Sequence, residues 1–108
     1  MESKEIQKTL QALGLCAKAR RLVTGTPMIC EALRGKQKPF LVLCASDNSE
    51  NTDKKLSDKT AFYGVRTVRL SCDGETLAAA VGKSGRVAAV AVCDENLSRL
   101  VEGTLRET

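Results

Sequence analysis

The chain has 108 residues, of which 43% are hydrophobic and 28% charged, as is typical of one globular domain spanning residues 1–108. Seventeen Lys and Arg against 13 Asp and Glu give a net charge of +4. The longest apolar run, Val87–Cys93, is far shorter than the roughly 20 residues of a membrane-spanning helix. Charged residues interrupt the N-terminus where a signal peptide would be apolar. We therefore expect a cytoplasmic protein with no membrane partner.

The first predicted element is an amphipathic helix, because apolar residues recur at spacings of three and four. The stripe consists of Ile6, Leu10, Leu13 and Ala17. Gly14 interrupts this pattern at a cost of about 1 kcal/mol relative to alanine. Its presence indicates a tight packing contact or a bend.

A short strand at Leu22–Thr24 is predicted next, followed by Gly25. Thr26 as the N-cap and Pro27 in the first turn indicate the start of a second helix. Gly35, with a proline beyond it, ends that helix near Arg34 after about two turns.

Strands and helices then alternate to the end of the chain. Two apolar runs, 40–45 and 87–93, predict buried strands, and 65–70 predicts a half-exposed strand. Helices are expected over 50–63, burying Leu56 and either Tyr63 or Ala61, over 75–81, ending at Gly82, and after Asp94 as cap. This alternation predicts an α/β fold, a three-layer αβα sandwich with a small mixed, mostly parallel sheet of about four strands.

The residues that carry most enzymatic chemistry are missing or poorly placed. There is no histidine, and the five cysteines form an odd set without a CxxC pair. We therefore expect no enzymatic activity, no cofactor, no metal and no disulfide. The cysteines are interpreted as small buried hydrophobes. A thiol-based redox role is the minor alternative, with Cys72 as its candidate, since a helix N-terminus favours a thiolate.

The positive charge is concentrated in the first third of the chain. Residues 1–39 contain eight Lys or Arg and three Glu. Lys18, Arg20 and Arg21 immediately precede the predicted helix start, whose N–H groups and dipole favour phosphate. Lys36 and Lys38 extend this positive charge at the other end of the same helix. The glycine-rich stretch 82–86 could join this site or form an ordinary turn between a helix and a strand.

Three blocks of sequence resemble one family in the same order. Residues 13–25 (LGLCAKARRLVTG) are similar to the opening of the bacterial YlxQ-type ribosomal-protein-like family. Residues 45–52 (ASDNSENT) with 54–59 (KKLSDK), and 80–83 (AVGK) before Arg86 and Val87, resemble its second and third signatures. The resemblance extends over roughly residues 6–98.

This resemblance implies membership of the kink-turn-binding superfamily of ribosomal proteins L-seven-Ae and L-thirty-e. It therefore implies an αβα sandwich that binds RNA and catalyses no reaction. In the superfamily, RNA is held by the start of the second helix and by the loop before the last strand, which here are Gly25–Glu31 and Gly82–Val87. With the basic residues, the predicted RNA-binding set is Lys18, Arg20, Arg21, Gly25, Thr26, Pro27, Met28, Lys36, Gly82, Lys83, Ser84, Gly85 and Arg86.

The chain departs from kink-turn binders at the start of the second helix. Those proteins carry an Asn-Glu pair and a following lysine, where this chain has Pro27, Met28 and Glu31. Proline and methionine cannot hydrogen-bond base edges, so we expect structured RNA, ribosomal or otherwise kinked, to be held mainly through phosphates. Contact with the ribosome or a translation factor is also expected. The alternative is a protein-interaction module of the translation machinery that has lost specific kink-turn recognition.

Overall fold

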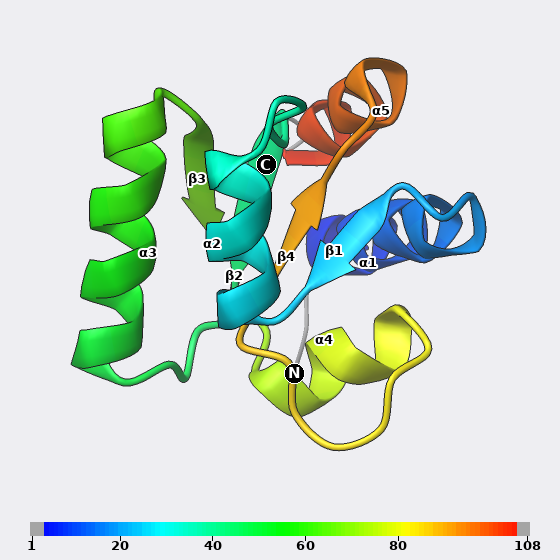
Figure 1. Cartoon of the computed structure of the whole chain (residues 1–108). Coiled ribbons are helices and arrows are strands. Elements are labelled where there is room, and N and C mark those ends of the chain that lie inside the picture. The colour runs from blue at the N-terminus through cyan, green and yellow to red at the C-terminus, as the bar shows by residue number, and fades with distance from the viewer. Residues whose placement is uncertain (1–3, 106–108) are drawn as a thin grey trace.

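The structure is a computed structural model that describes residues 4–105, so the ends of the predicted domain lie outside the described residues. Five helices alternate with four strands in this range (Figure 1). The helices are α1 (Lys4–Lys18), α2 (Thr26–Arg34), α3 (Glu50–Tyr63), α4 (Gly74–Ala80) and α5 (Glu95–Leu105). The strands are β1 (Leu22–Thr24), β2 (Leu41–Cys44), β3 (Arg66–Arg69) and β4 (Ala89–Val92).

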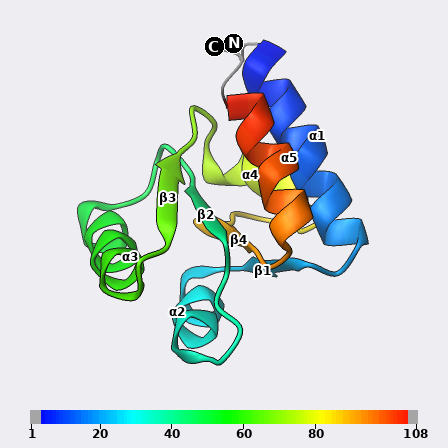
Figure 2. The ribbon, with the colours of Figure 1, turned by 90° about the horizontal axis from the view of Figure 1, so that it is seen from above.

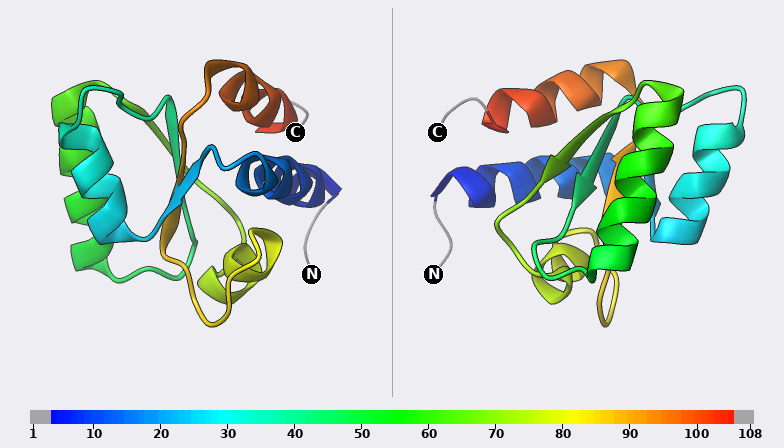
Figure 3. Two further views of the ribbon diagram at one scale, coloured as in Figure 1. Left: turned by 45° about the vertical axis from the view of Figure 1, so that its right-hand side comes forward. Right: turned by 90° about the vertical axis from the view of Figure 1, so that its left-hand side faces the viewer.

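The sheet lies between two layers of helices. Helices α2 and α3 cover one face, and α1, α4 and α5 cover the other (Figures 2 and 3). Each face has its own apolar core, because alternate residues of the central strands point to opposite sides. On β2, Leu43 packs toward α1, α4 and α5, whereas Val42 packs toward α2 and α3. The predicted three-layer αβα sandwich is confirmed.

The prediction that most of the sheet is parallel is wrong. The strand order is β1-β4-β2-β3, and only β2 and β3 pair in parallel. Helix α4 has seven residues and spans only about 10 Å, so it does not carry the chain back along the sheet. The chain enters β4 at the end where β2 finishes, with Ala89 opposite Cys44. Strand β4 therefore runs antiparallel to both of its neighbours.

Most predicted elements occur within one or two residues of their expected bounds. The buried strands are shorter than the apolar runs, covering 41–44 and 89–92. The N-cap of α2 is Gly25, not Thr26, because glycine alone readily adopts the backbone angles φ 91° and ψ 145° found there. Helix α3 buries Leu56 as predicted, and Tyr63 is half-buried, whereas Ala61 is exposed.

Candidate nucleic-acid interface

Arg20 occupies an unusual position in the turn that ends α1. The N–H groups of Arg20 and Arg21 donate to the carbonyls of Ala17 and Cys16, each over 3.0 Å. This pattern normally places glycine in the left-handed conformation. Arg20 has φ 60° there and is the one non-glycine residue with positive φ in residues 4–105. A non-glycine residue in this conformation carries a backbone strain of about 1 kcal/mol.

Replacing Arg20 by glycine is expected to stabilise the fold by about 1 kcal/mol, because glycine adopts this conformation without strain. Thermal unfolding would show the gain as a higher Tm. Arg20→Ala is the matched control, since it removes the same cation but keeps the strained conformation. Equal stability of the two variants would contradict this account.

A hollow of about 290 Å³ lies where α1, β1 and the segment after α4 meet. Arg20 approaches it from the α1 turn, Thr24 from β1, and Lys83 from the loop that precedes β4. The fold therefore brings Arg20 and Lys83 together, although they are 63 residues apart in the sequence (83 − 20). Both residues belong to the predicted RNA-binding set.

The cations of this hollow lack carboxylate partners, whereas four arginines elsewhere have them. Among the described residues, neither Arg20 nor Lys83 forms an ion pair. The arginines outside the hollow that do form ion pairs have their charge partly neutralised by carboxylates. They are Arg66, Arg69, Arg86 and Arg99. The hollow is thus a place where positive charge remains available to an anion.

The start of α2 lies directly after the strand that lines the hollow. The Gly25 N–H donates to the carbonyl of Ala89 over 3.0 Å, which fixes the helix start to β4. No side chain caps this helix, and Pro27 has no N–H. The N–H groups of Thr26 and Met28 therefore have no acceptor within the helix. These two donors and the helix dipole favour an anion at this end.

Two of the predicted cations are directed elsewhere. The Arg21 carbonyl accepts a 2.8 Å hydrogen bond from the Cys93 N–H, and Arg21 lies beside Cys93 instead of lining the hollow. Lys36 follows Arg34, the last residue of α2, and the end of this helix lies about 14 Å along its axis from its start. Nearby, the Lys38 ammonium lies 5.5 Å from the centre of the Tyr63 ring. The structure does not bring Lys36 together with the cations of the hollow.

Arg86 links the loop before β4 to the loop after β2 through side-chain hydrogen bonds. Its Nη2 donates to Asp47 Oδ1 over 2.9 Å and to Asn48 Oδ1 over 2.7 Å. This guanidinium holds the pKa of Asp47 below its usual value. The same Asp47 oxygen accepts from the Gly74 N–H over 2.9 Å. Arg86 therefore acts within the protein as a clamp, while Ser84 and Gly85 are exposed in the loop that it holds.

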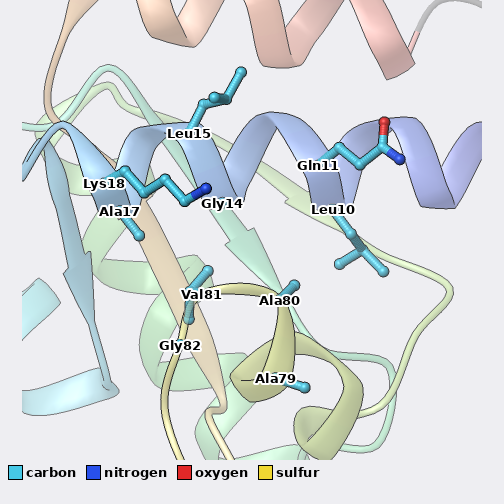
Figure 4. A pocket seen from close by; sticks show the side chains of 10 residues that line it. All are labelled: Leu10, Gln11, Gly14, Leu15, Ala17, Lys18, Ala79, Ala80, Val81 and Gly82. Atoms are coloured by element: carbon cyan, nitrogen blue, oxygen red, sulfur yellow. The ribbon is translucent and has the colours of Figure 1, made fainter.

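The sequence did not reveal the groove that adjoins this hollow. It lies between α1 and the end of α4 and has a volume of about 850 Å³ (Figure 4). Lys18, a predicted site residue, lines it. A side chain on Gly14 would lie 3.1 Å from the Ala80 carbonyl oxygen, so the predicted tight contact at this glycine is confirmed. The glycine at position 14 and the apolar stripe on α1 are the sequence features that could have indicated this groove.

The cysteines of this chain are buried or half-buried. Four cysteines are buried and Cys93 is half-buried, and all five are free. Burial raises the pKa of Cys16, Cys44 and Cys93, that of Cys44 to about 11, so these thiols stay protonated at neutral pH. Cys72 is 2% exposed. Within residues 4–105, no cluster of cysteines and carboxylates could hold a metal ion, and no helix could cross a membrane.

Known proteins of one family match most of the chain. The model of the ribosomal protein L7Ae/L30e/S12e/Gadd45 family matches residues 7–102. RNA-binding protein YlxQ of Enterococcus faecium is 35% identical over 81 residues, which are 75% of this chain and 77% of that protein. RNA-binding protein YlxQ of Bacillus subtilis (strain 168) is 35% identical over 86 residues, or 80% and 83% of the two chains. The resemblance read from the sequence is confirmed.

Solved structures agree with this assignment. A protein with unknown function from Bacillus halodurans C superposes with a TM-score of 0.83 at 35% identity, covering 93% of this chain and 98% of that one. The Giardia lamblia 15.5kD RNA binding protein gives a TM-score of 0.78 at 15% identity, covering 99% and 89%, and at this identity the likeness concerns the fold alone. The chain belongs to the ribosomal protein L7Ae/L30e/S12e/Gadd45 family.

Proposed function

We propose that this protein binds structured RNA, holding its phosphates with Arg20, Lys83 and the start of α2, and catalyses no reaction on it. Ribosomal RNA and other kinked RNAs of the translation machinery are the proposed ligands. The relatives from Enterococcus faecium and Bacillus subtilis carry the name RNA-binding protein, and each is 35% identical to this chain. This degree of identity supports a shared class of ligand.

The observation that carries the proposal is the meeting of Arg20 and Lys83 at one hollow. Neither forms an ion pair among the described residues, so a phosphate would meet full positive charge from both. Thr24, which also lines the hollow, is followed directly by the start of α2. A phosphate backbone lying across this edge of the sheet could therefore reach two side-chain cations and two backbone N–H groups.

The start of α2 supports recognition of RNA shape and backbone over base edges. Pro27 and Met28 are exposed, and neither side chain can donate a hydrogen bond to a base. Glu31 is exposed one turn further along and repels phosphate. The site thus offers contacts to phosphates but few side chains that could form base-specific hydrogen bonds.

Replacing Arg20 and Lys83 together by glutamine is expected to weaken binding of a labelled RNA hairpin about tenfold at low salt. Because two phosphate contacts disappear, the slope of log affinity against log salt should become shallower by about 1.5. Fluorescence anisotropy at several salt concentrations measures both quantities.

The matched control replaces Lys55 and Lys59 by glutamine. These exposed lysines lie on α3, form no ion pair among the described residues, and give the same change in net charge. If the RNA affinity fell equally in both double variants, the effect would be due to overall charge alone. That result would reject the site.

A second candidate function is docking of a protein from the translation machinery. Met28 supports it, because its side chain is 56% exposed at the start of α2, where a kink-turn binder would need a polar group. Recovery of one defined protein partner after nuclease treatment, lost on Met28→Ser, together with no affinity for folded RNA, would favour this alternative.

A further inference from the structure

We infer that the groove between α1 and α4 receives an unpaired base of the bound RNA. The inference rests on the proposed function and specifies which part of the RNA this surface would take. It concerns a region separate from the start of α2, formed by one face of α1 and by the end of α4.

The shape of the groove suits a flat apolar group. Leu10 and Ala17 point from α1 toward Ala80 and Val81 (Figure 4), and between them Gly14 approaches the end of α4 so closely that an added Cβ would lie 3.1 Å from the Ala80 carbonyl oxygen. The volume of about 850 Å³ falls within the roughly 300–1,000 Å³ typical of sites for small organic ligands. No aromatic residue lines the groove, so an aliphatic surface would contact the base.

The charges around the groove favour a nucleotide over an apolar peptide. Lys18 is the one charged residue among the ten that line the groove, and its side chain lies along α1 (Figure 4). The groove also shares Ala17, Val81 and Gly82 with the hollow where Arg20 and Lys83 meet. No carboxylate lines either space. A ligand that joins a flat apolar ring to a phosphate matches this pairing of an apolar groove with adjacent unneutralised cations.

A pair of RNA hairpins tests the inference directly. One carries a single unpaired adenosine, and the other has an abasic residue at the same position, so the two have identical phosphates. We expect the unmodified protein to bind the first about tenfold more tightly, because removing roughly 55 Å² of apolar base surface from water contributes that factor. Fluorescence anisotropy with each labelled hairpin gives the two Kd values.

Filling the groove should abolish this preference. Ala79 is exposed and lines the groove from α4, so Ala79→Leu narrows the space without changing the core. We expect its preference to fall below about twofold, with the affinity for the abasic hairpin unchanged. Ala61→Leu on α3, an exposed alanine outside the groove, is the control and should keep the full preference.

The inference and the proposed function can fail separately. Equal Kd values of the unmodified protein for the two hairpins, or a preference that survives Ala79→Leu, would overturn the groove as a base site. Such a result would leave the phosphate site intact if the Arg20 and Lys83 double variant still weakened binding to both hairpins. A base preference that disappears on filling the groove, with no effect of the double variant, would support the groove and reject the phosphate site.

Discussion

Replacing Gly74 by alanine is expected to destabilise the protein by about 2 kcal/mol, because the new side chain would be overpacked against Arg86. Gly74 is buried at the start of α4, and an added Cβ would lie only 2.4 Å from Arg86 Cγ and 2.9 Å from Nε. The arginine would have to move, and its hydrogen bonds to Asp47 and Asn48 would be lost. Chemical denaturation of the two proteins measures the difference.

A double-mutant cycle identifies the cause. Within an Arg86→Ala background the overlap is gone, and alanine is favoured over glycine in a helix by about 1 kcal/mol. Gly74→Ala should therefore be neutral or stabilising there, with a coupling energy of about 2 to 3 kcal/mol between the two positions. A similar cost in both backgrounds would mean that Arg86 is not what requires glycine at position 74.

Replacing Leu13 by alanine is expected to destabilise the protein by about 3 kcal/mol, the largest effect of a single substitution that we predict. Leu13 is fully buried between α1 and the sheet, where its removal leaves a cavity. For a domain of this size, about 3 kcal/mol corresponds to a fall in Tm of roughly 15 °C.

Leu15 provides the control, since it lies two residues away on the same helix and is 53% exposed. Leu15→Ala changes helix propensity by the same amount but should change stability by less than about 0.5 kcal/mol. Thermal unfolding of both variants checks the orientation of α1. Similar losses from the two substitutions would show that α1 is rotated relative to the described structure, and the groove would then be lined by different residues.

The boundaries of the elements could be predicted because the signals that set them are local. The spacing of Ile6, Leu10 and Leu13 fixes the buried face of α1. Gly35 and Pro39 stop α2, and the side chain of Asp94 accepts from the Leu97 N–H at the start of α5 over 2.9 Å, as its predicted capping role requires. Each signal depends on residues within one or two turns of one another.

The direction of β4 could not be read from the sequence. An apolar run from Val87 to Cys93 identifies a buried strand but carries no information on its orientation. The antiparallel pairing follows from the short span of α4 and from the point at which the chain then enters β4, with Ala89 opposite Cys44. A mostly parallel sheet would need a full crossover between β3 and β4, which a helix of seven residues does not span.

The sequence by itself determined the order of helices and strands and the basic segment that precedes α2, because these depend on neighbouring residues. Only the tertiary structure decided how that basic segment is used. It places Arg20 with Lys83 and Arg21 beside Cys93, although the two arginines are adjacent in sequence. It also pairs Arg86 with Asp47, 39 residues away. Contacts over such separations are fixed by the packing of whole elements, which no local pattern specifies.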